Sequence, residues 1–140
     1  MEVDIKHDCA GVDWKAVSET LKTVGMAHYA PDDHRRAFEG SHTTVFVYHA
    51  GGLIGFGRAI SDGVYQAAVY DCAVLPEFQG KGIGKKIVEA ILLRVLQCNV
   101  ILYANPGKEG FYQKLGFRRM KTGMARFKKS ESMMERGFTD

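Results

Sequence analysis

A glycine-rich stretch between an apolar run and an amphipathic run is where the sequence points most directly to ligand chemistry. The stretch reads Gln79-Gly80-Lys81-Gly82-Ile83-Gly84-Lys85-Lys86. A turn that feeds a helix presents unpaired backbone N–H groups at the positive end of the helix dipole, so a phosphate group can bind there without a cationic side chain. The glycines carry no Cβ and let the backbone approach the ligand closely. The stretch therefore predicts a site for a phosphate or pyrophosphate group.

The spacing of this loop excludes the two common nucleotide-binding motifs. A Walker A loop has a glycine five residues before Gly84 and a Ser or Thr after Lys85, where this chain has Gln79 and Lys86. A dinucleotide fingerprint is G-x-G-x-x-G after the first strand of a parallel unit, whereas the pattern here is G-x-G-x-G after an antiparallel meander. Taken alone, the loop also allows a plainer interpretation, in which the glycines form a tight connection and the lysines are solvated.

A second segment places two polar side chains around the end of a predicted buried strand. Asn105 directly follows that strand, and Tyr112 comes seven residues later on a predicted helix. Phe111 and Leu115 are four residues apart and share one helix face, which turns Tyr112 about 100° away from it. These side chains are candidates for holding or activating a ligand at the strand end.

Apolar periodicity predicts the elements that must position these residues. Strands are predicted over residues 2–6, 43–49, 53–60, 64–74, 100–104 and 124–127. Helices are predicted over residues 14–24, 32–38, 83–96 and 108–115, and the tail from residue 128 shows no clear period. Gly51-Gly52 predicts a hairpin turn, Pro76 ends the strand before the glycine loop, and Gly116 ends the last helix.

Composition is that of a single globular domain over residues 1–140, with 128–140 as an irregular tail. Hydrophobic residues make up 46% and charged residues 25%, which argues against disorder. A formal net charge of only +3 suits an anionic small ligand and argues against a nucleic-acid partner. The three cysteines form no C-x-x-C pair and are expected to be reduced. No apolar run is long enough to span a membrane, and no leader pattern is visible, so we expect a cytoplasmic protein.

With both motifs in place, the chain resembles the GNAT superfamily of N-acetyltransferases. The phosphate loop of that family has the pattern Gln/Arg-x-x-Gly-x-Gly/Ala, matched by Gln79, Gly82 and Gly84. Its later motif of Asn, then Phe-Tyr, then Gly-Phe is matched by Asn105, Phe111-Tyr112 and Gly116-Phe117. The resemblance covers most of the chain. It implies an α/β (α+β) fold with a mixed, mostly antiparallel sheet of about six to seven strands, about four flanking helices, and a V-shaped splay between the fourth and fifth strands.

The resemblance also implies where acetyl-coenzyme A binds as the co-substrate. Backbone groups of Cys72 and Val74 would pair with the pantetheine like an added strand, and the loop amides would cradle the pyrophosphate. Asn105 would hold the pantetheine arm, although a strand-end turn residue is the alternative there. The expected coenzyme-binding residues are Cys72, Val74, Gln79, Gly80, Lys81, Gly82, Ile83, Gly84, Lys85, Asn105, Phe111 and Tyr112. No metal is expected.

Acetyl transfer to an amine requires a proton acceptor, an oxyanion donor and a partner for the leaving thiolate. An amine attacks a thioester only as the neutral base, so an amine with a pKa of about 10 must lose a proton. Asp71 is the expected acceptor, directly or through water; a structural carboxylate paired with a basic neighbour is the alternative. The resemblance assigns the Val74 N–H to the oxyanion and Tyr112 to the coenzyme sulfur.

The acceptor is the part of the reaction that the sequence constrains least. The family takes its acceptor specificity largely from the first two helices and their loop, here residues 26–38, where His28, Tyr29 and Phe38 are candidates for an amine pocket. We expect an enzyme that acetylates a primary amine of a small molecule, peptide or protein by direct attack in a ternary complex. The alternative is a non-catalytic acyl-coenzyme A sensor on the same fold. The identity of the amine and the formation of a homodimer stay open.

Overall fold

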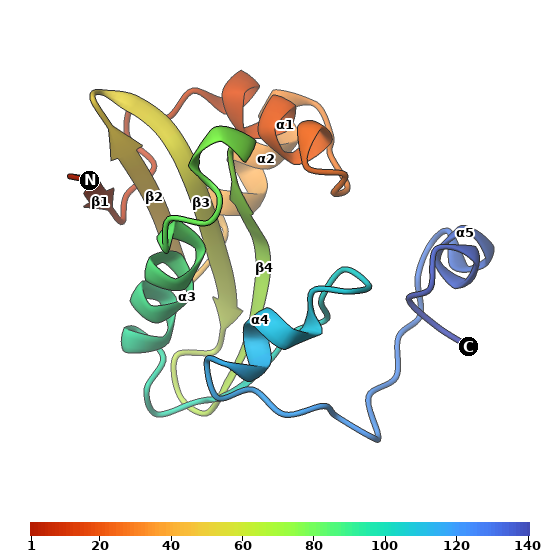
Figure 1. Ribbon diagram of the computed structural model, residues 1–140. Coiled ribbons are helices and arrows are strands. Elements are labelled where there is room, and N and C mark those ends of the chain that lie inside the picture. The colour runs from red at the N-terminus through yellow and green to blue at the C-terminus, as the bar shows by residue number, and fades with distance from the viewer. The chain divides into compact units, whose positions relative to one another are not determined.

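A five-stranded mixed sheet organises residues Met1–Leu102 of the computed structural model, which describes all of residues 1–140 (Figure 1). The strands lie in the order β1-β2-β3-β4-β5, and they are β1 (Asp4–Lys6), β2 (Thr43–His49), β3 (Gly52–Ser61), β4 (Gln66–Val74) and β5 (Asn99–Ile101). Neighbours from β1 to β4 are antiparallel, and β5 runs parallel to β4. Parallel neighbours such as β4 and β5 need a crossover connection, and the helix α3 (Ile83–Leu93) supplies it.

The helices of this unit begin where the sequence offers start signals. They are α1 (Trp14–Thr23), α2 (Pro31–Glu39), the short 3₁₀ helix η1 (Pro76–Phe78) and α3 (Ile83–Leu93). Asp13 caps α1, because its side chain accepts the N–H of Ala16 at 3.1 Å. Pro31 occupies the first turn of α2, where its missing N–H is not needed.

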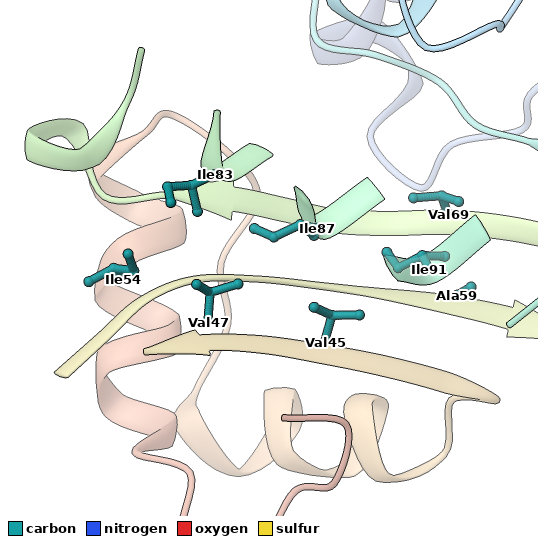
Figure 2. Close-up of a cluster of buried hydrophobic side chains, with 8 residues drawn as sticks. All are labelled: Val45, Val47, Ile54, Ala59, Val69, Ile83, Ile87 and Ile91. Carbon is teal, nitrogen blue, oxygen red and sulfur yellow. The ribbon is translucent and has the colours of Figure 1, made fainter. Parts of the chain in front are cut away.

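Two apolar clusters sandwich the sheet. The cluster against α3 contains Val45, Val47, Ile54, Ala59, Val69, Ile83, Ile87 and Ile91 (Figure 2). The cluster against α1 and α2 contains Val12, Val17, Leu21, Phe38, Phe46, Phe56 and Ala73. Successive residues of β2 alternate between the two clusters, as the period of a strand requires. The sheet is therefore buried on both faces at its centre.

Residues Tyr103–Asp140 form a second unit, described here by itself. It contains α4 (Glu109–Gln113) and α5 (Ser130–Glu135). The ring of Tyr103 meets the edges of Phe127 and Phe138, with centroids 5.3 Å and 6.0 Å apart. Gly116 has φ 94° and follows α4, which confirms it as the residue that ends this helix.

The predicted fold class is confirmed, but the sheet has five strands rather than six or seven. The strand predicted over residues 124–127 is absent, because this segment has no buried face: Met124 is 95% exposed. The predicted helix over residues 83–96 stops at Leu93, and Leu96 is 76% exposed. Conversely, α5 lies in the tail for which the sequence shows no period. None of the helices combines the length and the apolar character that crossing a membrane requires.

Candidate active site

A bulge in β4 interrupts the regular ladder between β3 and β4. Gly57 of β3 faces two residues of β4, Asp71 and Cys72, while its neighbours pair one to one. Asp71 adopts a left-handed backbone with φ 56°, which costs a non-glycine residue roughly 1 kcal/mol. A Cβ at position 57 would lie 2.8 Å from both Cys72 Sγ and Ile87 Cγ2. The bulge therefore depends on a glycine at position 57 and on a residue at position 71 that tolerates positive φ.

The extra residue changes the side of the sheet to which the end of β4 points. Val69 packs in the cluster against α3, whereas Ala73 packs in the cluster against α1 and α2. Residues four apart in an uninterrupted strand would face the same side. As a result Cys72 packs against the α3 cluster, and Asp71 is turned to the opposite side of the sheet.

The backbone of Val74 faces the open edge of β4. Leu75 donates its N–H to the Ile54 carbonyl at 2.9 Å, so Val74 occupies a position that is not hydrogen-bonded to β3, and its own N–H and C=O point away from that strand. Gln79 supports this direction, because its side-chain amide donates to the Val74 carbonyl at 3.0 Å. β5 pairs only with residues 66–68, so no strand of the first unit covers the edge at Val74.

α3 begins with a turn of uncapped backbone N–H groups. Gly80 and Gly82 have φ 76° and 81°, and no side chain caps the helix. The N–H of Lys86 donates to the Gly82 carbonyl at 3.1 Å, so the amides before Lys86 in this turn have no carbonyl partner within the helix. Lys81 and Lys85 are exposed beside them. The arrangement can hold an anion by backbone amides and by the positive end of the helix dipole.

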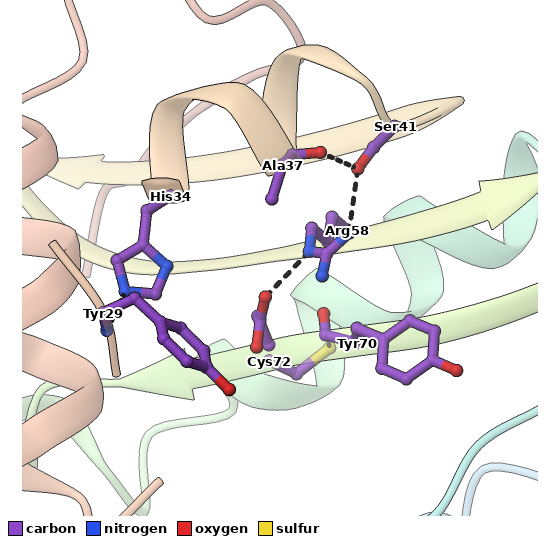
Figure 3. Close-up of polar contacts among 8 residues, drawn as sticks. Tyr29, His34, Ala37, Ser41, Arg58, Tyr70 and Cys72 are labelled. Carbon is purple, nitrogen blue, oxygen red and sulfur yellow. Dashed lines mark hydrogen bonds and ion pairs between the residues drawn. The ribbon is translucent and has the colours of Figure 1, made fainter. Parts of the chain in front are cut away.

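Arg58 of β3 joins the bulge to α2 (Figure 3). Its Nε–H donates to Asp71 Oδ2 at 2.7 Å, and its Nη1 donates to Ser41 Oγ at 3.3 Å. The guanidinium carbon lies 5.6 Å from the ring centroid of Phe38 and 5.4 Å from that of Tyr70. The side chains of the ion pair are 15% and 22% exposed. The carboxylate expected to accept a proton is therefore held in an ion pair, as in the structural alternative.

Both backbone groups of Tyr29 are tied to side chains of the flanking helices. Its N–H donates to Nε2 of the buried His34 at 2.9 Å, and its carbonyl accepts the Ser18 hydroxyl at 2.6 Å. Burial lowers the pKa of His34, which favours the neutral imidazole that can accept this bond. The Tyr29 ring is 63% exposed, and His28 is exposed beside it in the chain. Phe38, by contrast, is 1% exposed and is a core residue.

The Cys72 thiol is unsuited to act as a nucleophile. Burial, with a smaller contribution from the neighbouring Asp71 charge, raises the pKa of the Cys72 thiol to about 12. The nucleophilic thiolate form of this side chain is therefore scarce at neutral pH.

Asn105, Phe111 and Tyr112 belong to the second unit. The Asn105 carbonyl accepts the N–H of Lys108 at 2.9 Å, which forms a turn before α4. The Tyr112 ring lies edge-on between Phe111 and Phe117, with centroid distances of 4.9 Å and 5.8 Å. Aromatic contacts therefore fix the Tyr112 ring within this unit, whereas Asp71, Val74 and the glycine loop are fixed within the first.

Two residues of this region, Arg58 and His34, were not among the residues expected from the sequence. Arg58 had a usable signal, since it is the charged residue within an apolar, glycine-rich strand, and Asp71 stands in the strand expected to pair with it. His34 had none, because its bond is to a backbone N–H, which any residue between the helices would provide.

The three-dimensional arrangement can be compared with known proteins. Residues 41–119 match the model of the acetyltransferase (GNAT) domain. The chain is 33% identical over 120 residues to serotonin N-acetyltransferase 2, a chloroplastic protein of Oryza sativa subsp. japonica, covering 81% of this chain and 60% of the relative. It is 40% identical over 68 residues to a histone acetyltransferase of Glycine max, covering 46% of this chain and 29% of the relative.

A crystal structure agrees with these matches. It is that of a protein of unknown function from meticillin-resistant Staphylococcus aureus, described as a probable acetyltransferase, with a TM-score of 0.81, 25% identity, and coverage of 91% of this chain and 99% of that one. The chain spans 60% or less of the length of the two relatives matched by sequence. The match over residues 41–119 and the identity over 120 residues show that the chain belongs to the GNAT acetyltransferase family.

Proposed function

We propose that the chain transfers an acetyl group from acetyl-coenzyme A to a primary amine by direct attack in a ternary complex. The observation that carries this proposal is the continuity between the open edge of β4 at Val74 and the uncapped start of α3. Gln79 links the two through its bond to the Val74 carbonyl. One strand end thus offers an edge for an amide-containing arm and a cradle for a pyrophosphate.

Acetyl-coenzyme A would supply an activated thioester, and coenzyme A would leave as the thiolate. The amides from Gly80 to Lys85 bind the pyrophosphate, and the backbone of Cys72 and Val74 pairs with the pantetheine as an added strand. Asn105 and Phe111, which the resemblance to the family assigns to the coenzyme, would bind the same arm. These assignments agree with the family to which the chain belongs.

Three groups take part in the reaction itself. The Val74 N–H donates to the oxyanion, a contribution typically of about 3 kcal/mol. Tyr112 donates a hydrogen bond to the departing sulfur. A phenol with a pKa of about 10 is a weaker acid than a thiol with a pKa of about 8.5, so complete proton transfer is uphill by about 2 kcal/mol. The hydrogen bond therefore stabilises the thiolate without transferring the proton. The amine proton leaves to Asp71 or directly to water. The pH–rate profile of Asp71→Gly separates the two routes: if Asp71 is the base, the fall in rate at low pH that reports its protonation disappears in this variant.

The acceptor binds beside the segment between α1 and α2 in this proposal. The names of the two relatives suggest two acceptors, serotonin and a histone. The exposed Tyr29 ring, tied through both of its backbone groups, favours an amine that can stack on it. Phe38 supports this region from the core rather than contacting the acceptor.

The release of free thiol tests the proposal. The protein is mixed with acetyl-coenzyme A and a panel that includes serotonin and a lysine-containing histone peptide, and free sulfhydryl is followed. Turnover with an amine supports the enzyme, and saturable binding of acetyl-coenzyme A without turnover supports the sensor. Tyr112→Phe should lower kcat with little change in the KM for acetyl-coenzyme A. Tyr65→Phe, at an exposed tyrosine between β3 and β4, is the matched control.

A further inference from the structure

We propose that Arg58 is a positioning residue for acetyl transfer, which holds the β4 bulge through Asp71 and so keeps the Val74 N–H directed at the open edge. The inference rests on the proposed function, because it concerns the donor assigned to the oxyanion. It gives Asp71 a role in the shape of the strand rather than in proton transfer. In this role none of these side chains contacts the substrate.

The surroundings of Arg58 restrict its guanidinium in several directions. The aromatic rings of Phe38 and Tyr70 lie 5.6 Å and 5.4 Å from the guanidinium carbon, and they come from α2 and β4. Ser41, just after α2, accepts from Nη1 and in turn donates to a carbonyl of the last turn of α2, so its hydroxyl is itself fixed (Figure 3). These contacts fix the orientation of the guanidinium, whose Nε–H donates to Asp71 Oδ2 at 2.7 Å.

The bulge needs such an anchor because the strand has a competing register. If residue 71 entered the regular ladder, Val74 would move from its place opposite Gly55 to a place opposite Ile54. Adjacent ladder positions alternate between groups that face the partner strand and groups that face away. In the slipped register the Val74 N–H would therefore turn toward β3, where it could no longer meet an oxyanion at the open edge.

The slipped register would also move the Asp71 side chain to the other face of the sheet. It would then stand opposite Gly57, on the side where Ile87 and Ile91 pack. A carboxylate is strongly disfavoured among such side chains unless it is paired. In the bulged register the same carboxylate meets Arg58 instead. The ion pair thus selects the register in which Val74 is directed outward.

Kinetics of matched variants test the role of Arg58. Arg58→Met removes the polar anchor and keeps an unbranched side chain, and kcat should fall about 100-fold, the size of effect expected from a displacement of about 1 Å at a reacting group. The KM for acetyl-coenzyme A should rise as well, because Val74 also pairs with the pantetheine, but by less than kcat falls, since the cradle at α3 is untouched. Arg58→Lys should recover part of kcat. Arg35→Met is the control, since Arg35 forms exposed ion pairs within α2. Equal kcat values for Arg58→Met and Arg35→Met would overturn the inference.

A series at position 71 separates positioning from base catalysis. Glycine adopts positive φ freely, asparagine tolerates it, and valine does not. Every variant of this series loses the ion pair, so for a positioning residue we expect kcat to fall in all four, least for glycine and asparagine, more for alanine and most for valine, with Asp71→Val at least about 100-fold below the parent. A uniform loss of kcat in all four variants, with loss of the acid limb of the pH–rate profile, would instead identify Asp71 as the base and overturn the inference.

A measurement without turnover keeps the inference separate from the proposed function. In the parent protein the Val74 amide should exchange with solvent readily, because it faces the open edge, and in Arg58→Met it should become protected as it bonds within the sheet. Nuclear magnetic resonance would follow this exchange, together with φ at residue 71. An unchanged Val74 amide and an unchanged φ in Arg58→Met would refute the positioning role. A parent that binds acetyl-coenzyme A but acetylates no amine would refute only the proposed function.

Discussion

Gly57→Ala tests whether the contact of the β4 bulge with α3 leaves room for a side chain. The added methyl carbon would lie 2.8 Å from Cys72 Sγ, 2.8 Å from Ile87 Cγ2 and 3.2 Å from Ile91 Cδ1. Carbon atoms in contact prefer about 3.5–4.0 Å, so α3 or the strands must shift, and overpacking of a core costs about 1–3 kcal/mol. The lower entropy of the unfolded alanine chain offsets about 0.4–1 kcal/mol of this cost. We therefore expect the free energy of unfolding to fall by about 1–2 kcal/mol.

Urea unfolding of matched variants measures this loss. Gly52→Ala is the control, because Gly52 lies in the same strand and the nearest atom to its Cβ would be the His49 carbonyl oxygen at an ordinary 3.6 Å. Cys72→Ala removes one of the two closest atoms, so the double variant Gly57→Ala/Cys72→Ala should lose less than the sum of the single losses. An equal unfolding midpoint for Gly57→Ala and Gly52→Ala, or a double variant whose loss is the sum of the two single losses, would refute an overpacked contact at position 57.

Three further predictions follow from conformations and pKa values. Gly82→Ala places a side chain at φ 81° without a clash and should weaken acetyl-coenzyme A binding about fivefold, as measured by calorimetry. Gly11→Ala, also at positive φ, is the control and should leave the affinity unchanged. Equal affinities of the two variants would contradict a role of the Gly82 turn in binding. With a pKa of about 12, the partly buried Cys72 thiol should resist iodoacetamide at pH 8 in the folded protein and react in urea, as followed by mass spectrometry. Rapid labelling of the folded protein would contradict the raised pKa. The pKa of His34 is lowered from 6.5, so its contribution to stability should be complete above about pH 6.5 and lost as the pH falls through its lower folded value. Urea unfolding at several pH values should show this loss in the parent and not in His34→Gln, and identical pH profiles would contradict it.

Features with a local cause could be predicted from the sequence. Asp13 caps α1, Pro31 starts α2, and Gly51 turns the hairpin, because each acts through its own backbone or through neighbours a few residues away. The two-residue sequence Leu75-Pro76 likewise marks where β4 ends. In each case the signal and the structure that it causes lie within one turn of chain.

Features that depend on long-range packing could not be predicted in this way. The run of residues 66–74 looks like one uninterrupted strand, since the extra residue at position 71 is revealed only by the partner strand and by the two cores. The ion pair of Arg58 with Asp71 joins residues 13 apart in the chain and depends on that same pairing. Residues 124–127 lack a buried face, so the strand predicted over them does not form.

Asp71, the extra residue in β4, is not needed to align the rest of the strand with β3. Deleting Asp71 would leave Tyr70, Cys72, Ala73 and Val74 opposite the same β3 residues as before, now in an unbroken ladder. The shortened chain should therefore keep both cores. It would lose the bend that a bulge introduces beside the edge at Val74. The insertion thus makes the sheet less regular at the place where the proposed reaction needs an accessible strand edge.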